Sequence, residues 1–400
     1  MRALLGWTLA LSLAGCQASV VGMPDATEPE PPYAPPPLTP AFPENPPPPL
    51  GAVEVKIPPA AAPDAGPTAD AETFGAKPAP RSGEERNTLL GGERGLDHVG
   101  IATADLGAAK DAFLALGFSN PQDGVLPNGI QNVNFYFADG TYLELLTFYD
   151  RQKAPDIARF VERNRSGPMF AVLAVASAED TAAFLRQRGF SVGKPRPGRI
   201  DPAGGSGKPT SSQPMWHTLM FDRPALPGDP LFFIAYDRAV REELWRKLED
   251  EKARRAFAHA NTVEGLRAIW IAVRDLESAR AAYARAGLSE VEAVTLPQLS
   301  ARGVALAAGQ GSVLLLAPQE GRGPVAEFLA QRGEGILGIS LRVSRLPRAR
   351  AVVERGIAAK VMAYAGPFGP SLLLTPDRAA GTWLEFTAGP PQKSSGAGGS

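Results

Sequence analysis

Apolar and polar positions repeat in the same order in two stretches of the chain. Gly95–Phe118 has the sequence GLDHVGIATADLGAAKDAFLALGF and Gly265–Leu288 has GLRAIWIAVRDLESARAAYARAGL; they align without a gap and are identical at 9 of 24 positions. Each begins with a short apolar run and continues with apolar residues at helical spacing. The helical positions are Leu106, Ala109, Ala112, Phe113 and Leu116 in the first stretch and Leu276, Ala279, Tyr283 and Ala286 in the second. Each stretch is therefore predicted to form a strand followed by a helix.

The residues that the two stretches share are those that a strand–helix unit needs. They include an aspartate at the helix N-cap position and a glycine just past the helix end. These are Asp105 and Gly117 in the first stretch and Asp275 and Gly287 in the second. The imidazole of His98 is not shared, because Ala268 stands at the aligned position. The repeat is thus interpreted as a retained scaffold whose chemistry was free to change.

The strand–helix pattern occurs twice more, in fainter form, at residues 170–190 and 338–357. Short runs typical of β-strands follow each of the four helices. They are residues 132–137 and 142–148, 216–221 and 231–236, 303–307 and 312–316, and 371–374 and 382–387. The chain is therefore predicted to have an α+β fold of four βαβββ modules, paired into two domains at 95–237 and 265–389. Residues 238–264 contain a charged amphipathic stretch and are predicted to form a connecting helix.

Residues 16–94 differ in composition from the rest of the chain. Of the 40 prolines, 19 lie between residues 17 and 94, among few large apolar residues. Such a segment cannot bury enough apolar surface to offset the entropy of ordering it, so a disordered Pro-rich linker is predicted. The tail, residues 390–400, is also predicted to be disordered. The net charge of -1 and the lack of a basic stripe give no indication of nucleic-acid binding.

The first sixteen residues have the pattern of an export signal. Arg2 precedes an apolar run, residues 3–14, that is too short to span a bilayer. The run leads into Leu13-Ala14-Gly15-Cys16, which resembles the bacterial lipoprotein box, and Cys16 is the only cysteine of the chain. The resemblance implies removal of residues 1–15, lipidation of Cys16 and attachment to a membrane of the cell envelope, the outer membrane in a Gram-negative cell. The alternative is an ordinary secretory signal with a chance cysteine.

Three stretches carry a resemblance to a known family. They are GLDHVGIATADLGAAKDAFLALGF, GTYLELL at residues 140–146, and HANTVEGLRAIWIAVRDLESARAAYARAGL at residues 259–288. Together with the four modules, they resemble the glyoxalase-like branch of the vicinal oxygen chelate superfamily. The resemblance implies that paired modules curl into a cup, with metal ligands from a His on the first strand and a Glu on the last strand of each module. Such ligands leave an open position at which adjacent oxygens of a substrate bind a divalent ion.

The first domain retains one half of such a site, with His98 and Glu144 at the first-strand and last-strand positions. The corresponding places of its second module are assigned to apolar residues, Phe170 and Ala235. In the second domain Glu385 alone matches the family pattern. The other three places are assigned to Ala268, Leu315 and Gly338. The first domain is therefore the one predicted to bind a small-molecule ligand.

The candidate residues leave several roles open. His98 and Glu144 would form an acid–base pair, a partial metal site, or a polar contact that fixes the sheet. His217 would complete a metal set of two His and one carboxylate if its strand faces inward. The amides of Asn132 and Asn134 would orient a ligand or serve as turn and edge-strand residues.

The leading hypothesis is an exported, membrane-anchored protein that binds a small molecule in its first domain, with a degenerate metal site. One alternative is a lyase or dioxygenase that depends on a divalent metal, and another is a non-catalytic scaffold of the envelope. The cofactor is accordingly open between none and a divalent metal ion. An inward His217 would favour the enzyme, whereas cups filled by bulky side chains would favour the scaffold.

Overall fold

The computed structural model describes residues 95–388, apart from 127, 199–213, 229–230, 241–249, 251–254 and 256. The predicted signal peptide, Cys16, the linker, most of the connecting helix and the tail lie outside the described residues. Within the described ranges, no helix is long and apolar enough to cross a membrane.

The first sheet has eight strands in the order β2-β3-β4-β1-β5-β8-β7-β6. Its strands are β1 (Gly95–Thr103), β2 (Gln122–Leu126), β3 (Ile130–Tyr136), β4 (Tyr142–Phe148), β5 (Ser166–Ala174), β6 (Arg196–Gly198), β7 (Trp216–Leu219) and β8 (Leu231–Tyr236). Three helices accompany it, namely α1 (Leu106–Ala115), α2 (Pro155–Asn164) and α3 (Ala178–Gln187).

The second sheet repeats this arrangement in the order β10-β11-β12-β9-β13-β16-β15-β14. Its strands are β9 (Val263–Ala272), β10 (Glu290–Leu296), β11 (Ala301–Ala308), β12 (Gly311–Pro318), β13 (Gly335–Val343), β14 (Met362–Gly366), β15 (Gly369–Leu374) and β16 (Trp383–Thr387). The accompanying helices are α6 (Leu276–Arg285), α7 (Pro324–Arg332) and α8 (Leu346–Ile357), with short 3₁₀ turns at Pro297–Leu299 and Pro376–Arg378.

The two sheets confirm the α+β fold of four paired βαβββ modules. In each sheet the first strands of two modules pair antiparallel at the centre, β1 with β5 and β9 with β13. Each of these strands also pairs in parallel with the last strand of its own module. The strand that follows each helix directly was not assigned from the sequence. These strands are β2, β6, β10 and β14, and each lies at an edge of its sheet.

The predicted helix ends are also confirmed. The carboxylate of Asp105 accepts a hydrogen bond from the Ala108 amide at 2.9 Å, and that of Asp275 accepts one from the Ser278 amide at 3.0 Å. Gly117 has φ +87° just past the end of α1, a conformation that a side chain would strain. The shared residues of the repeat are therefore those that begin and end its helices.

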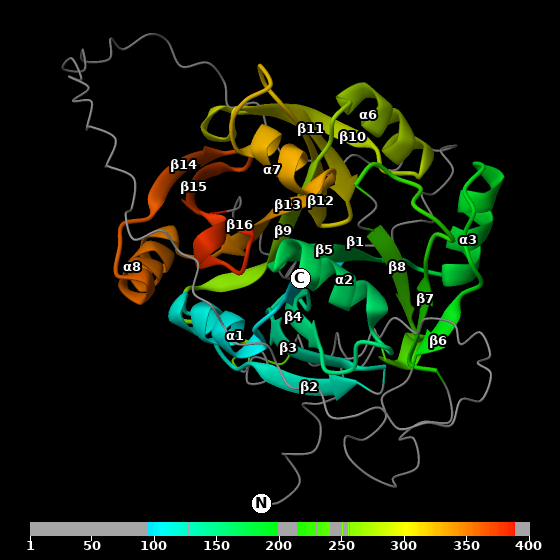
Figure 1. The fold of residues 1–400 in the computed structure, drawn as a ribbon, viewed down its shortest axis with the longest axis horizontal. Coiled ribbons are helices and arrows are strands. Elements are labelled where there is room, and N and C mark those ends of the chain that lie inside the picture. Colours follow the sequence, from blue (N-terminus) through cyan, green and yellow to red (C-terminus); the bar gives the residue numbers. More distant parts are fainter. Residues whose placement is uncertain are drawn as a thin grey trace, which may run out of the picture. The chain divides into compact units, whose positions relative to one another are not determined.

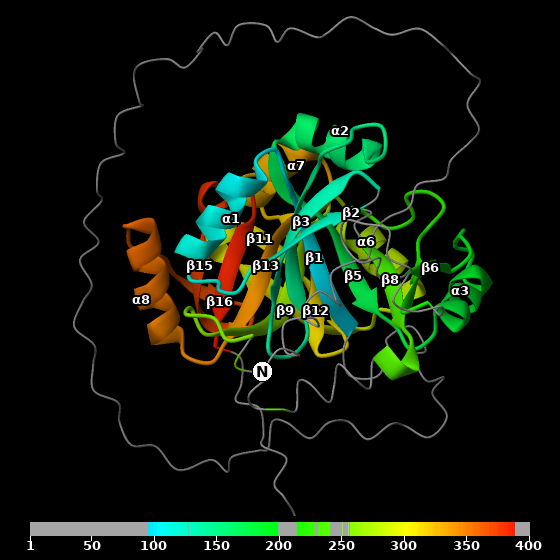
Figure 2. The same ribbon diagram turned by 90° about the horizontal axis from the view of Figure 1, so that it is seen from below.

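Each sheet has two differently covered faces. One face carries an apolar core that is continuous between the sheets and includes side chains of α1, α3, α6 and α8; we call it the shared core. Figures 1 and 2 show α1 and α8 side by side at one edge of this arrangement. The opposite face, which we call the cup face, packs against α2 in the first domain and α7 in the second. Since strand residues alternate between faces, Val99 and Ile101 enter the shared core while His98 lies on the cup face.

Polar contacts also join the two domains. The Nδ1 atom of His259 accepts a hydrogen bond from the Ser119 amide at 2.9 Å, and its Nε2 lies 2.9 Å from the Tyr136 carbonyl oxygen and donates to it. Burial lowers the pKa of His259, which favours the neutral ring that this pattern requires. The amide of Asn261 donates to the Leu116 carbonyl at 3.0 Å. His259 and Asn261 therefore join the segment that precedes β9 to the first domain.

Candidate functional site

A β-bulge in β1 brings two adjacent polar side chains together. Leu96 pairs with Leu173 and His98 with Val172, so Asp97 is the extra residue between them. Its Oδ1 atom lies 2.8 Å from Nδ1 of His98, and both side chains are fully buried. The hydroxyl of Tyr236, on β8, donates to the same Oδ1 at 3.0 Å. Since a carboxylate only accepts, His98 carries its proton on Nδ1 and presents Nε2 on its other side.

Glu144 lies beside this pair on the cup face of β4. The parallel register of β1 and β4 places it opposite Gly100, two positions beyond the His98–Tyr142 pair and on the same face. Its Oε2 is 3.9 Å from His98 Nε2, which is too long for a hydrogen bond. Its Oε1 accepts a hydrogen bond of 2.7 Å from Asn132 Nδ2. Burial raises the pKa of Glu144, against the opposing effects of His98 and Asn132.

Aromatic rings enclose the imidazole of His98. The ring of Tyr142 stacks on it with centroids 4.3 Å apart and planes 16° apart. Phe170 and Phe232 present their rings edge to face at 6.2 and 6.4 Å. The imidazole is therefore held in one orientation by packing on its faces and by Asp97 at Nδ1.

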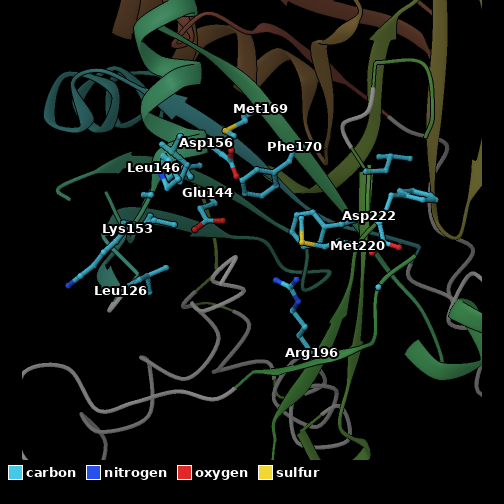
Figure 3. Close-up of a pocket in the computed structure, with 18 of the residues that line it drawn as sticks. Leu126, Glu144, Leu146, Lys153, Asp156, Met169, Phe170, Arg196, Met220 and Asp222 are labelled. Carbon is cyan, nitrogen blue, oxygen red and sulfur yellow. The ribbon is translucent and has the colours of Figure 1, made fainter. Parts of the chain in front are cut away.

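A cavity of about 430 Å³ opens over Glu144, which is 6% exposed. Its walls are mainly apolar and include Leu126, Ile130, Leu146, Met169, Phe170 and Phe232. Its charged residues besides Glu144 are Lys153, Asp156, Lys194, Arg196 and Asp222. Figure 3 shows Glu144 near the middle of the cavity, with Phe170 beside it and the guanidinium of Arg196 directed toward it. His98 does not line this cavity, so Glu144 connects the cavity to the polar groups behind it.

Two sequence-based assignments are wrong because their strand residues face the other way. Ala235 packs in the shared core, on the face opposite the cup. The parallel register of β5 and β8 pairs Val172 with Phe232, as β1 and β4 pair Gly100 with Glu144, so Phe232 takes the place assigned to Ala235. His217 lies opposite Ala235 on β7 and shares its face. It therefore points away from His98 and Glu144 and cannot complete a site with them.

The other assigned side chains lie on the cup face in different roles. Phe170 forms part of the cavity wall. Asn132 does not line the cavity; its amide nitrogen holds Glu144. Asn134 stands directly across from Glu144 in the β3–β4 pairing, and both of its buried amide atoms find no hydrogen-bond partner among the described residues.

These residues do not fit a divalent ion held by the protein. Catalytic sites of this kind usually supply three protein ligands, whereas His98 Nε2 and Glu144 Oε2 are two donors 3.9 Å apart. No group of three His, Cys, Asp or Glu able to hold a metal occurs in the part of the chain that the structure describes. The hydrogen bond from His98 Nδ1 to Asp97 is typical of metal-bound histidines, but here it orients a ligand set that is incomplete.

The second domain has the same arrangement of strands, but different side chains occupy its cup face. Ala268 pairs with Ser340 and Trp270 with Gly338, which makes Trp270 the counterpart of Gly100. The register of β9 and β12 makes Leu314 the counterpart of Glu144, while Leu315, assigned from the sequence, faces the shared core. Trp270 is completely buried among apolar residues of the cup face. This cup face is therefore packed by bulky side chains.

Glu385 is retained in that packed face as a buried carboxyl. It is 0% exposed and accepts a hydrogen bond of 2.5 Å from the Ser340 hydroxyl, which in turn accepts one of 2.8 Å from Trp270 Nε1. Its Oε1 atom finds no hydrogen-bond partner among the described residues. Burial raises the pKa of Glu385 to about 7.

Three residues of the first site were not identified from the sequence. They are Asp97, Tyr236 and Phe232. A signal for the first was present, since an acidic residue next to His98 within an apolar strand is costly unless it has a partner. The positions of the other two depend on the strand register, which the sequence does not state.

Comparisons with known proteins agree with this fold. Residues 96–287 match the model of the family described as a glyoxalase-like domain. This match supports the resemblance of residues 96–287 to the glyoxalase-like branch of the vicinal oxygen chelate superfamily. No curated protein matches it.

Several solved structures are similar to this chain. Methylmalonyl-CoA epimerase from Mycobacterium tuberculosis is 27% identical, with a TM-score of 0.30, over 32% of this chain and 91% of that chain. A mutant of 4-hydroxymandelate synthase from Streptomyces coelicolor is 13% identical, with a TM-score of 0.49, over 74% of this chain and 92% of that chain. A hypothetical protein from Staphylococcus aureus is 12% identical, with a TM-score of 0.47, over 73% of this chain and 98% of that chain.

Proposed function

We propose that the first domain binds a small molecule in the cup over Glu144, and that the second domain is a packed copy with a structural role. One observation carries the proposal: a buried carboxylate lines a cavity of about 430 Å³ in which apolar residues outnumber charged ones. That volume is in the range of small-molecule pockets, which are mostly apolar with a few placed polar groups. The ligand therefore has a polar end at Glu144 and an apolar body against Phe170 and Phe232.

A metal-dependent lyase or dioxygenase is not proposed, because the donor set around His98 does not fit a divalent ion. A pure scaffold with both cups closed is not proposed either. It accounts for the second domain, where Trp270 packs the cup face, but leaves a cavity over Glu144 unused.

The test is a fragment screen by ligand-observed NMR on the full chain, repeated on a variant with a blocked cavity. Met169→Trp places an indole in the cavity wall, and fragments that bind the wild type should lose at least tenfold in affinity to this variant, because a filled cavity leaves no room for them. Met362→Trp, at an exposed position of the second domain, is the matched control and should bind as the wild type does. Hits that bind Met169→Trp unchanged, or a screen without hits, would overturn the proposal.

We further propose that Cys16 anchors the protein to a membrane of the cell envelope. The support is the apolar run of residues 3–14 that leads into this single cysteine. Cys16→Ser should move the protein from the membrane to the soluble envelope fraction without changing its thermal unfolding. Membrane partitioning that persists in Cys16→Ser would refute the anchor.

A further inference from the structure

The polar groups at the base of the first cup are mainly acceptors. In its neutral form His98 donates through Nδ1 to Asp97 and keeps a lone pair on Nε2, and that atom is buried without a hydrogen-bond partner among the described residues. The Oε2 atom of Glu144 lies 3.9 Å from it. The Oδ1 atom of Asn132 is likewise buried without a partner among the described residues. An imidazole nitrogen, a carboxylate oxygen and an amide oxygen thus gather behind one wall of the cavity.

Two donors at this base are already committed, while the amide nitrogen of Asn134, across from Glu144, is buried without a partner among the described residues. The amide nitrogen of Asn132 donates to Glu144 Oε1 at 2.7 Å, and the hydroxyl of Tyr236 donates to Asp97 at 3.0 Å. A carbonyl or carboxylate on the ligand would therefore meet an acceptor at Glu144. Buried polar groups that face one another without a donor between them are unfavourable, because each loses its hydrogen bond to water.

The charged residues at the bottom of the first cup also favour a hydrogen-bond donor on the ligand. Asp97 and Glu144 are two carboxylates on either side of the single imidazole of His98. Lys153, Lys194 and Arg196 also line the cavity and could meet a ligand carboxylate there. Beside Asp97 and Glu144, however, a ligand carboxylate would add a third negative group in a poorly solvated place, whereas a ligand ammonium would add a compensating positive charge.

We infer that the first cup selects a ligand that offers a hydrogen-bond donor, a primary ammonium or a hydroxyl group, to Glu144 from an apolar body. The inference rests on the proposed function and names the chemical class of its ligand. The donor binds Glu144 Oε2 at the cavity wall, and the apolar body packs against Phe170 and Phe232. Asp97 is a positioning residue, since it fixes the tautomer in which His98 is an acceptor toward Glu144.

Four benzyl-sized probes separate donors from acceptors at nearly constant shape: benzylamine, benzyl alcohol, acetophenone and benzoate. Titrations of the full chain by NMR should show saturable binding of benzylamine and benzyl alcohol. Acetophenone and benzoate should bind at least about tenfold more weakly, because a hydrogen bond to a charged group is lost. Comparison of the two donor probes shows whether the charge of the ammonium contributes beyond the hydrogen bond.

Glu144→Gln is the decisive variant, because it keeps the shape and removes the charged acceptor. Its affinity for benzylamine should fall about tenfold or more, while Glu385→Gln, the matched change on the last strand of the fourth module, should leave it unchanged. A second measurement needs no variant: the chain has three histidines, so long-range ¹H–¹⁵N spectra resolve the ring nitrogens. His98 Nε2 should give the signal of an unprotonated nitrogen, and that signal should move when benzylamine binds.

The outcomes separate the inference from the proposed function. If fragments bind the cup but acetophenone or benzoate binds as tightly as benzylamine, or neither donor probe binds, the inference is wrong and the proposed function stands. A protonated His98 Nε2 with unprotonated Nδ1, or unchanged benzylamine affinity in Glu144→Gln, also overturns the inference. If neither fragments nor probes bind, both fall.

Discussion

Replacing Glu385 with glutamine should change how the stability of the protein depends on pH. The carboxyl is completely buried, and its Oε2 accepts a hydrogen bond from Ser340. Burial penalises the charged form, which raises its pKa from the ordinary 4.5 to about 7. Glutamine has nearly the same shape but carries no titrating proton, so Glu385→Gln removes this contribution alone.

The sign and the size follow from the two pKa values. Because the folded-state pKa is above the unfolded one, the folded protein binds this proton more tightly, and its stability falls as pH rises from about 4.5 to about 7. One pKa unit corresponds to about 1.36 kcal/mol, so the loss attributed to Glu385 is about 3 kcal/mol and is complete above about pH 7. A buried amide hydrogen left unpaired in the variant would cost stability too, but by the same amount at every pH.

The assay is urea unfolding of wild type and Glu385→Gln at intervals between pH 4.5 and pH 8, followed by tryptophan fluorescence. Trp270 reports directly on this region, since its Nε1 donates to Ser340. The free energy of unfolding of the variant relative to the wild type should rise by about 3 kcal/mol across this range. A difference that stays constant within about 0.5 kcal/mol would show that Glu385 does not titrate as a buried carboxyl, and would refute the reasoning.

Two smaller perturbations test the packing of the fold by urea unfolding. His259→Ala removes two hydrogen bonds to the first domain and should cost about 1–3 kcal/mol, because their buried partners are left unpaired. His217→Ala, which removes no such hydrogen bond among the described residues, should change stability by under about 1 kcal/mol. Equal losses in both variants would contradict the assigned contact. Gly338→Ala would place its Cβ 2.7 Å from the Trp270 ring and should cost about 1–3 kcal/mol. Gly107→Ala is the helical control, because the nearest neighbour of its added Cβ would be 3.4 Å away, and it should be neutral or stabilising by up to about 1 kcal/mol. An unchanged stability in Gly338→Ala would mean that the Trp270 ring moves freely.

The parts of the fold that sequence predicts well are those fixed by local chemistry. Asp105 and Asp275 begin their helices by accepting a hydrogen bond from an amide three residues ahead, within the same stretch of chain. Strand β8 was predicted at its observed bounds, Leu231–Tyr236, because its side chains are nearly all apolar. Helices α2 and α7 were missed, although Pro155 and Pro324 at their first positions and buried residues at helical spacing are signals for both. Both helices lie in the connections between modules, outside the repeated strand–helix unit.

The errors in the site have a different cause, because the face of a strand residue is set by pairing between distant segments. A shift by an odd number of residues reverses the face. The assigned and the actual position differ by three residues for Ala235 and Phe232 and by one for Leu315 and Leu314. The bulge at Asp97 has the same origin, since it exists only in the pairing of β1 with β5. Sequence could therefore identify His98 and Glu144 as candidates but could not place the groups that hold and surround them.

The same register explains why one copy keeps an open cup and the other does not. In both sheets one cross-strand pair combines a glycine with an aromatic residue, Gly100 with Phe170 in the first and Gly338 with Trp270 in the second. A Cβ at either glycine would collide with the ring opposite, so each pair has room for one side chain only. The aromatic residue lies on the second module's first strand, β5, in the first copy and on the first module's first strand, β9, in the second copy. Only the first copy combines it with the polar pair His98 and Glu144.

The bulge has been retained in both copies with its charge reversed. Arg267 occupies the bulge of β9 at the position of Asp97, and its guanidinium lies over the ring of Phe368 at 4.0 Å. An imidazole introduced at residue 268 would therefore stand beside a cation that cannot accept its Nδ1 proton, next to the buried ring of Trp270. A histidine at residue 268 alone cannot restore the site, because its neighbours determine both the tautomer of the imidazole and the space around it. The chemistry of the first cup thus depends on Asp97, His98, Gly100 and Glu144 together, while the second copy keeps the scaffold without any of the four.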